Sequence, residues 1–517
     1  MPQLDRNWDR RPVDERRALQ IARLRRHLRT QVAPFSPFYR RKFAEWGFDP
    51  ASLRTWDDLR RIPFTTKQDL LPSEQNPSGA KSFILQPTPE LIRTALPKSE
   101  LLKFVAKKVF RGEARLKRDL VNEYSPASLI FTTGRSSSSI PFFLTPFDEQ
   151  LMLESGRRIT AVLGLEPGRD RTVSLFPYAP HLAFWQVAYC GLATGLLTLN
   201  TGGGKIMPTE KLLGAIETMK PTCVAGMPGF FYHLVRKAVE EGRDFSSIHT
   251  VCLGGENVPA GFRSKVAESL ASVGAKNVKV TSVLGFTEAR LCWAECTGAP
   301  RTGFHTYPDL NLFEIVDPET GDPLPEGTTG ELVYTTLEGR GSSIVRYRTG
   351  DVIEGGIIES AACPGCGRLV PRIQSNLQRR SNVKSLDIGK IKGTLVNLNA
   401  LTELLAGDAD LEEWQLEIRK RNDDPFEVDE IVLHASLKRG VDAVAFTQRV
   451  QADVRNAAEI GLNEVRIEDT PALLRRIGME TLQKEERITD RRPKSGPAAA
   501  PAPASPTSAA KRPTARP

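Results

Sequence analysis

The sequence predicts an α/β protein with a smaller α+β part near its C-terminus. Between Leu129 and Tyr334, short apolar runs alternate with stretches of helical periodicity, which is typical of a domain built on a largely parallel sheet. Further along, Trp414–Ile418 and Glu430–His434 alternate apolar and polar residues as antiparallel strands do, and the helix-like stretch Val441–Glu459 follows them. A chain of 517 residues is too long for one core, so at least two domains are expected.

Helices are predicted before this α/β region. Residues 12–47 carry apolar residues at helical spacing, namely Leu19, Ile21, Leu24 and Leu28. After a loop at residues 77–80, the stretch Lys98–Leu120 has the pattern of a basic amphipathic helix, with eight basic and three acidic residues. Such a helix could lie on a membrane surface or bind a partner, but the pattern favours a solvated, charged helix packed on its own domain.

Charge and composition exclude several classes of protein. The net charge of +9 includes +6 from Arg491–Pro517, a Pro/Ala/Ser-rich tail that is predicted to be disordered. Outside this tail and Lys98–Leu120 the chain is close to neutral, so no nucleic-acid platform is predicted. No apolar run approaches the roughly 20 residues of a membrane span. The N-terminus has no apolar signal-peptide region, so a cytoplasmic protein is expected.

The run Arg346-Tyr347-Arg348-Thr349-Gly350-Asp351 is the most informative motif. It follows a strand-like segment and ends in a carboxylate at a Thr-Gly turn. The two oxygens of Asp351 can accept hydrogen bonds from the two hydroxyls of a ribose. A surface turn that closes a hairpin would give the same pattern.

Two further segments combine donors with a carboxylate. The Ser-rich loop Thr132–Ser139 can present N–H and O–H groups to phosphate oxygens, although a flexible linker would look the same. The segment Leu284–Glu288 follows a predicted strand, Val278–Val283, so Thr287 and Glu288 stand where α/β sheets bind ligands. Glu288 can bind Mg²⁺, or these residues can cap a following helix.

The seven cysteines suggest a metal site rather than disulfides. Cys363-Pro-Gly-Cys366-Gly has the spacing of a zinc knuckle, and tetrahedral zinc would need two more ligands. A thioredoxin-like redox pair is the alternative, but it would normally open a helix. Three other cysteines lie in apolar runs and are expected in the core: Cys190, Cys223 and Cys252.

Taken together, the chain resembles the phenylacetate–CoA ligase family of the adenylate-forming superfamily. The resemblance covers nearly the whole chain except residues 80–122, which look like an insertion, and the tail. It rests on several collinear segments: Pro37–Phe43, Leu59–Leu71, Asp317–Gly321, Gly330–Thr336, Arg346–Asp351 and Arg487–Arg492.

The resemblance implies a two-step ligase of the adenylate-forming fold. A carboxylic acid, either an aryl acid such as phenylacetate or a related acyl acid, would react with Mg·ATP to give an acyl-adenylate, and CoA would then displace AMP. The implied N-terminal domain covers residues 1–379 and a small mobile C-terminal domain covers residues 380–492, with a disordered tail at 493–517. A homodimer is one possible assembly.

The resemblance also implies a role for each matching residue. Lys484 would be the catalytic lysine of adenylation, Thr287 would touch phosphate and Glu288 would hold Mg²⁺. Further ATP contacts would come from Thr132, Thr133, Gly134, Arg135, Ser136, Ser137, Gly255, Glu256, Asp351 and Arg380. The acid would lie near Tyr178, His181, Phe184 and Met227. Cys296 and His305 would complete a zinc site with Cys363 and Cys366, and Cys292 is a spare candidate.

Departures from the family pattern keep two alternatives open. Arg135 replaces a Thr of the family's phosphate loop, and the second Gly and the Lys of that loop are absent. The alternatives are an adenylating enzyme with an acceptor other than CoA, and a degenerate nucleotide-binding protein.

Overall fold

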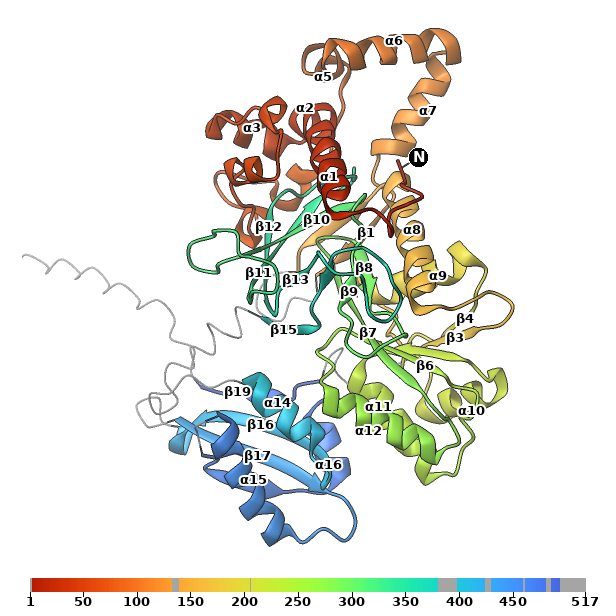
Figure 1. The fold of residues 1–517 in the computed structure, drawn as a ribbon, viewed down its shortest axis with the longest axis vertical. Coiled ribbons are helices and arrows are strands. Elements are labelled where there is room, and N and C mark those ends of the chain that lie inside the picture. The colour runs from red at the N-terminus through yellow and green to blue at the C-terminus, as the bar shows by residue number, and fades with distance from the viewer. Residues whose placement is uncertain are drawn as a thin grey trace, which may run out of the picture.

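The computed structural model describes residues 2–132, 139–204, 206–379, 398–423, 429–458, 461–479 and 485–492. We call residues 2–379 the main unit and residues 398–492 the C-terminal unit (Figure 1). Within the described residues, no helix is long and apolar enough to cross a membrane.

Helices form the N-terminal region, as the periodicity predicted. They pack around Leu24, Leu28 and Phe38, which are buried. The α-helices are α1 (Val13–His27), α2 (Ala33–Phe35), α3 (Pro37–Trp46), α4 (Lys67–Leu70) and α5 (Pro89–Thr94), with short 3₁₀ or π segments η1 (Leu28–Val32), η2 (Pro50–Ser52), η3 (Asp57–Arg61) and η4 (Gly79–Phe83).

The stretch Lys98–Leu120 is not one helix packed on the domain. Gly112, at φ +79°, separates α6 (Lys98–Arg111) from α7 (Glu113–Tyr124). No side chain of α6 is buried, and the two helices form an arm that projects from the main unit (Figure 1). The predicted packing is therefore wrong, because only the base of α7, at Tyr124, enters the core.

The predicted parallel sheet forms the centre of the main unit. Six strands run in the order β4-β3-β5-β6-β7-β8, all parallel except the last. They are β3 (Arg171–Ser174), β4 (Leu197–Asn200), β5 (Cys223–Gly226), β6 (Thr250–Gly254), β7 (Lys279–Phe286) and β8 (Leu291–Ala294). The helices on its two faces are α8 (Pro146–Leu163), α9 (Leu182–Thr194), α10 (Thr209–Met219), α11 (Pro228–Glu240) and α12 (Ala260–Ser272).

Alternate residues of these strands face opposite helix layers. Val224 packs in the core with α10, α11 and α12, whereas Ala225 and Cys252 pack in the core with α8 and α9. Since both faces are covered, the strands are apolar throughout rather than alternating with polar residues. A capping box between Thr145 and Asp148 begins α8, and Gly164 in the left-handed region ends it.

Antiparallel strands complete the main unit. One sheet has the order β10-β11-β12-β15, a smaller one has the order β13-β14-β9, and β1 pairs with β2. Their bounds are β1 (Ser128–Phe131), β2 (Pro141–Leu144), β9 (Phe304–His305), β10 (Asn311–Val316), β11 (Gly330–Thr336), β12 (Tyr347–Glu354), β13 (Ile357–Ile358), β14 (Arg372–Ile373) and β15 (Asn376–Arg379).

The C-terminal unit has its own sheet and core. Its strands run in the order β18-β17-β16-β19, and the two predicted strands lie inside β16 (Leu411–Lys420) and β17 (Asp429–Leu437), which are antiparallel. The other elements are α14 (Leu398–Gly407), η5 (Arg421–Asp423), α15 (Ala443–Ala458), β18 (Glu464–Ile467), α16 (Thr470–Arg476) and β19 (Ile488–Asp490). Leu405, Leu416 and Phe446 are among the residues of its core.

Candidate adenylation site and cysteine–histidine cluster

Three predicted segments meet at the carboxyl end of the central sheet. The carbonyl oxygen of Phe131 accepts a hydrogen bond from His181 Nδ1 (2.8 Å) and a longer one from Thr287 Oγ1 (3.5 Å). Phe131 precedes the Ser-rich loop, His181 precedes α9, and Thr287 follows β7. The structure thus brings the start of the predicted phosphate loop beside the Thr-Glu pair.

The ends of the Ser-rich loop are fixed, although residues 133–138 lie outside the described part of the chain. Thr132 Oγ1 accepts a hydrogen bond from Ile140 N (3.0 Å), and Ser139 Oγ donates to the Thr132 carbonyl (2.6 Å). Because β1 and β2 pair on either side, the loop is the connection of an antiparallel hairpin. The predicted phosphate contacts of Thr133, Gly134, Arg135, Ser136 and Ser137 stay predictions.

Glu288 does not begin a helix. Residues 287–290 form a turn, and β8 then returns antiparallel to β7, so the helix-capping interpretation is wrong. One carboxylate oxygen of Glu288 instead accepts a hydrogen bond from the hydroxyl of Tyr347 (3.0 Å). The Thr-Glu segment is thereby connected to the Arg-Tyr-Arg-Thr-Gly-Asp run.

That run is largely buried, and its two arginines are paired with acids. Arg346 is buried and forms a two-pronged ion pair with Glu314 (3.0 and 2.8 Å), and Arg348 pairs with Glu331, so both arginines hold the sheet together. Asp351 lies four residues beyond Tyr347 in β12, opposite Arg379 of β15. Arg380, the predicted helper of Asp351, follows Arg379 but lies outside the described residues.

The predicted acid-contacting residues lie around the N-terminal ends of α9 and α11. Tyr178 and Phe184 make an edge-to-face contact with ring centroids 5.1 Å apart, and Tyr178 is exposed. Met227 lies near Gly255, the residue that follows β6: a Cβ atom on this glycine would be 3.9 Å from Met227 Cγ. The wall of the cavity beneath α8 and α9 includes none of the four predicted residues Tyr178, His181, Phe184 and Met227.

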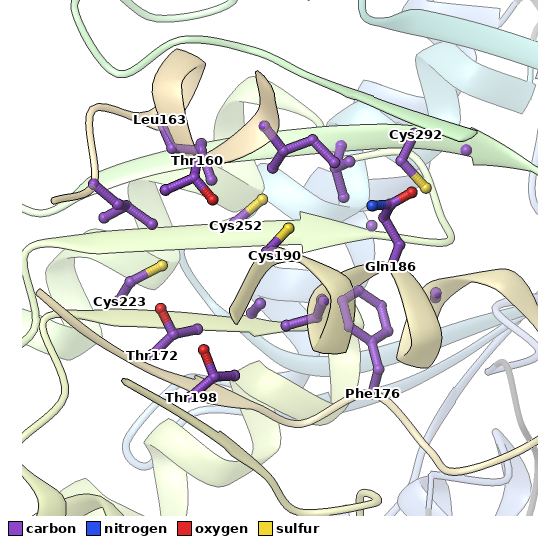
Figure 2. Close-up of a pocket in the computed structure, with 18 of the residues that line it drawn as sticks. Thr160, Leu163, Thr172, Phe176, Gln186, Cys190, Thr198, Cys223, Cys252 and Cys292 are labelled. Carbon is purple, nitrogen blue, oxygen red and sulfur yellow. The ribbon is translucent and has the colours of Figure 1, made fainter. Parts of the chain in front are cut away.

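The cavity lies between the central sheet and helices α8 and α9 and has a volume of about 100 Å³ (Figure 2). Its walls include Phe176 and Gln186, which the sequence did not single out. The cysteines expected in the core are buried as predicted, but Cys190, Cys223, Cys252 and Cys292 also line this space. Burial raises the pKa of Cys190 and of Cys223 to about 12, so these thiols are neutral and behave as small apolar groups.

Four of the predicted zinc ligands converge in a separate place. The ligand atoms of Cys296, His305, Cys363 and Cys366 all lie within 4.8 Å of one another. The Sγ atoms of Cys296 and Cys363 are 3.6 Å apart, close to the edge of a tetrahedron with bonds of about 2.3 Å. His305 Nε2 lies 3.2 Å from Cys366 Sγ, and its Nδ1 lies 3.3 Å from the Ala294 carbonyl, which orients the ring.

The chemistry of this cluster fits a metal better than a redox pair. The turn at 363–366 opens no helix, as a thioredoxin-like pair would. The thiol neighbours Cys296 and Cys366 hold the pKa of Cys363 far below its usual range, so a thiolate is favoured there. Cys292 is not part of the cluster, because it lines the cavity.

Comparison with known proteins agrees with this geometry. Residues 151–337 match the family of AMP-binding enzymes. A phenylacetate–coenzyme A ligase from Thermus thermophilus is 29% identical over 389 residues, 72% of each chain, and one from Aromatoleum evansii is 26% identical over 493 residues, 93% of this chain and 96% of that one. This chain is a relative of the phenylacetate–CoA ligases.

The fold also matches a solved structure. A crystal structure of a 2-hydroxyisobutyryl-CoA ligase in its postadenylation state superposes with a TM-score of 0.72, at 20% identity, over 94% of this chain and 92% of that chain. The predicted adenylate-forming fold is thus confirmed for this relative of the phenylacetate–CoA ligases.

The C-terminal unit also reaches the candidate site. Lys484 lies outside the described residues, but Glu485, the next residue, is buried against the N-terminal turn of α11. A Cβ atom on Gly229 would lie only 1.5 Å from Glu485 Oε1. Burial, with Glu256 among the nearby charges, raises the pKa of Glu485 to about 7. Glu256, predicted to border the adenine, is thus electrostatically coupled to the segment of the proposed catalytic lysine.

Proposed function

We propose that the protein is an AMP-forming acid–CoA ligase that activates a carboxylic acid with ATP. The observations that carry this proposal are two contacts at the carboxyl end of the central sheet. Thr287 lies beside Phe131, where the hairpin loop begins, and Glu288 accepts a hydrogen bond from Tyr347, which lies four residues before Asp351 in β12. Ligands of open α/β sheets bind at this edge. The match of residues 151–337 to the AMP-binding enzymes supports the same assignment.

In the first step, a carboxylate oxygen of the acid attacks the α-phosphorus of ATP, and the bond to the pyrophosphate oxygen breaks. The enzyme must offset the negative charge on the phosphorus centre and on the leaving pyrophosphate. The hydroxyl of Thr287 and the loop 132–139 would donate hydrogen bonds to phosphate oxygens, and Asp351 would accept them from the ribose hydroxyls. Lys484 would bridge the carboxylate and the α-phosphate.

Glu288 is suited to hold Mg²⁺ because it is a half-buried carboxylate beside the phosphate-binding residues. The metal would supply positive charge against the phosphate oxygens. Tyr347 donates to one oxygen of Glu288 and would keep the carboxylate oriented. In the second step, the CoA thiolate attacks the acyl carbon and AMP leaves.

We further propose that Cys296, His305, Cys363 and Cys366 hold a structural zinc ion. Its four protein ligands leave no open position, so it would join β9 and the 363–366 turn rather than take part in chemistry. A cytoplasmic location and a homodimer stay predictions.

The decisive experiment is ATP–pyrophosphate exchange with a panel of acids, followed by CoA-dependent release of AMP. The enzyme should show acid-dependent exchange without CoA, and stoichiometric acyl-CoA and AMP when CoA is added. Exchange without a CoA-dependent product would indicate another acceptor. No exchange with any acid, together with no ATP binding by calorimetry, would refute the ligase assignment.

A further inference from the structure

The cavity beneath α8 and α9 extends the candidate site inward. At one end it is bounded by Gly254, Gly255 and Gly285, which lie at the carboxyl ends of β6 and β7 beside Thr287. At the other end it reaches Thr172 and Cys223, the early residues of β3 and β5. Thr172 and Phe176, which both line the cavity, are separated by four rises of extended chain, or about 13 Å.

Within the proposed ligase function, we propose that the substrate is a slender aliphatic carboxylic acid whose chain fills this cavity. The carboxylate would stay at the glycine end, near Thr287 and Glu288, and the chain would run along the strands toward Cys223. The lining is dominated by aliphatic, thiol and methyl groups, so burying methylenes there is favourable by about 0.8 kcal/mol each.

The dimensions of the cavity favour a chain over a ring. Its volume of about 100 Å³ is below the ~150 Å³ of a cavity that holds benzene. The cavity is also narrow at its glycine end, near Gly285, which we call its neck. A Cβ atom on Gly285 would lie 2.4 Å from Cys292 Sγ and 3.4 Å from Leu182. A planar aromatic group would have to displace these buried side chains, whereas a methylene chain is slimmer.

Gln186 adds a polar preference to this apolar space. Its side chain is 3% exposed, and its Nε2 donates to the Met152 carbonyl (3.3 Å). Among the described residues, its Oε1 has no hydrogen-bond partner. Figure 2 shows this amide beside Cys292, toward the neck. Because a buried acceptor without a donor is costly, we expect a chain with a hydroxyl near its carboxyl end to bind better than the plain chain.

Two threonine hydroxyl groups of the cavity wall, unlike Gln186 Oε1, already have hydrogen-bond partners. Thr160 donates to the Gly156 carbonyl (2.9 Å) and Thr198 to the Leu196 carbonyl (3.0 Å), so these side chains are already satisfied. Thr172 Oγ1, at the far end, is the second buried oxygen without a partner among the described wall residues. The polar preference is thus confined to two positions.

The test is kcat/KM for butanoate, hexanoate, octanoate, decanoate and phenylacetate, each assayed by pyrophosphate release. The wild-type enzyme should prefer a straight chain over phenylacetate by about tenfold or more. Cys223→Leu narrows the far end and should shift the preference toward shorter acids, lowering the octanoate-to-butanoate ratio about tenfold. Cys223→Ser keeps the side-chain size and should keep the order of preference. Leu196→Phe narrows the same end if Cys223→Leu folds poorly.

A hydroxyl series isolates Gln186. Hexanoates with the hydroxyl moved along the chain should show one position that is favoured about tenfold, and Gln186→Leu should abolish that advantage. A preference for phenylacetate that Cys223→Leu and Leu196→Phe leave unmoved would overturn the aliphatic assignment while the ligase function stands. If no acid of either kind releases pyrophosphate, the ligase function itself fails.

The arm formed by α6 and α7, residues 98–124, carries a second and independent inference. Its exposed apolar side chains include Leu102, Val105, Val109 and Phe110, and Phe110 is 87% exposed. At 100° per residue, these side chains share one side of α6, while Lys107 and Arg111 occupy the opposite side. Exposed apolar groups gathered on one helix face mark an interaction surface.

We propose that this arm binds the surface of an anionic lipid membrane. Lys98–Leu120 contains eight basic and three acidic residues, which complements negatively charged head groups. An amphipathic helix with basic residues on its polar face lies in the membrane interface with its apolar side buried among the acyl chains. The supply of a water-insoluble aliphatic acid from a membrane would fit the cavity proposed above.

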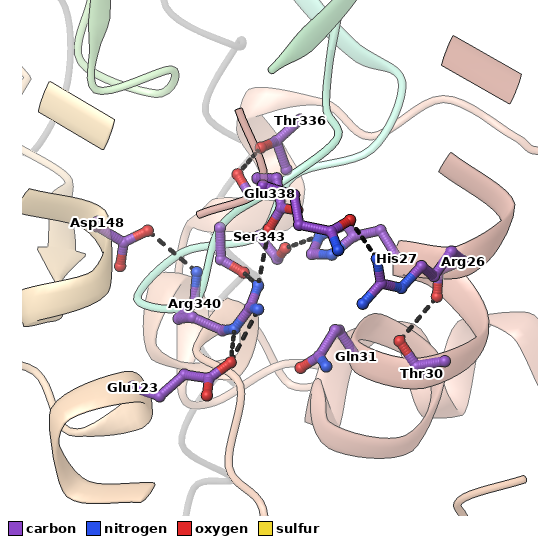
Figure 3. A network of polar contacts seen from close by, with 12 residues as sticks. Arg26, His27, Thr30, Gln31, Glu123, Asp148, Thr336, Glu338, Arg340 and Ser343 are labelled. Atoms are coloured by element: carbon purple, nitrogen blue, oxygen red, sulfur yellow. Dashed lines mark hydrogen bonds and ion pairs between the residues drawn. The ribbon is translucent and has the colours of Figure 1, made fainter. Parts of the chain in front are cut away.

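The base of the arm is firmly anchored, so its tip is held away from the main unit. Arg340 donates to Glu123 at the end of α7 (3.0 and 2.9 Å), as Figure 3 shows. Arg340 also stacks on the Phe147 ring at 4.0 Å. Tyr124 donates to Gln31 Oε1 (2.7 Å). The apolar side of α6 is therefore presented to the surroundings by a rigid support.

Vesicle sedimentation of the full chain tests this proposal. The protein should pellet with vesicles containing phosphatidylglycerol and much less with pure phosphatidylcholine, and added salt should weaken binding. The double variant Val109→Asp/Phe110→Asp should bind at least tenfold more weakly. Val444→Asp, at an exposed apolar position of the C-terminal unit, should bind as the wild type does.

The basic tail is present in all three proteins, so a difference between them assigns the effect to the arm. Equal binding of the wild type and the double variant would overturn the proposal. A wild-type dimer in solution that becomes a monomer in the double variant would also overturn it, because the surface would then bind a second copy.

Discussion

Replacement of Glu485 by Gln should alter how the two units dock. Glu485 is buried between the units, against Gly229 of α11. Burial is the largest cause of its raised pKa, Glu256 and Glu413 add to it, and Arg487 opposes it through a hydrogen bond (2.9 Å). Undocking would return the carboxyl group to water and remove the effect of Glu256, so its pKa would fall toward the ordinary value.

The size of the effect follows from the shift in pKa. The ordinary pKa of the Glu485 carboxyl group is 4.5, and its pKa in the docked state is about 7. Between these two pH values, the docked state therefore binds more protons than the undocked state. Docking is consequently strongest below pH 4.5 and weakens as the pH rises to about 7, by about 3 kcal/mol in total. Gln resembles the protonated form, so Glu485→Gln should dock about 100-fold more tightly than the wild type at pH 8.

Small-angle X-ray scattering at pH 6 and pH 8 can measure the docked fraction. The wild-type protein should be more compact at pH 6, whereas Glu485→Gln should be equally compact at both values. Glu486→Gln, one residue further along, is the matched control and should follow the wild type. If Glu485→Gln keeps the pH dependence of the wild type, the buried carboxyl group does not control docking.

Three further predictions concern the metal, the nucleotide and the unit interface. Cys363→Ser should lose one zinc ion per chain by metal analysis and about 4 kcal/mol or more of stability in thermal unfolding. The control Cys252→Ser should keep its zinc. Equal zinc content in both variants would refute the site. Asp351→Ala should weaken ATP binding at least 100-fold in calorimetry, because two hydrogen bonds to a charged group are lost; unchanged affinity would exclude the ribose role. Gly229→Ala places a Cβ atom on the Glu485 carboxyl group and should slow ATP–pyrophosphate exchange about tenfold, while Gly214→Ala, which has open space, should not.

The fold was predictable from the sequence because its signals are local. The apolar runs of β5 and β6 and the alternation in β16 and β17 each arise from how one strand is buried. The packing of α6 was not predictable in this way. Its pattern describes an apolar face but does not say what covers that face, and in the structure nothing within the described residues buries it.

The metal site was predictable because the Cys363–Cys366 spacing and the family resemblance together supply all four ligands. Cys296 and His305 were assigned through the family resemblance, and the structure brings both to the Cys363–Cys366 pair. The cavity was not foreseen, because its walls come from alternate residues of separate strands and two helices. Small residues at every second position, such as Cys223 and Ala225, were the only signal in the sequence.

The contacts between the two units suggest an interface that can open and close. Lys265 of α12 donates to the Leu411 carbonyl (2.6 Å), and Arg236 of α11 pairs with Glu412. Burial lowers the pKa of Lys265 to about 8, so docking withdraws an ammonium group from water. Charged groups regain hydration on separation, which makes a polar interface cheaper to open than an apolar core. We infer that the C-terminal unit docks reversibly, as two successive reactions at one cleft require.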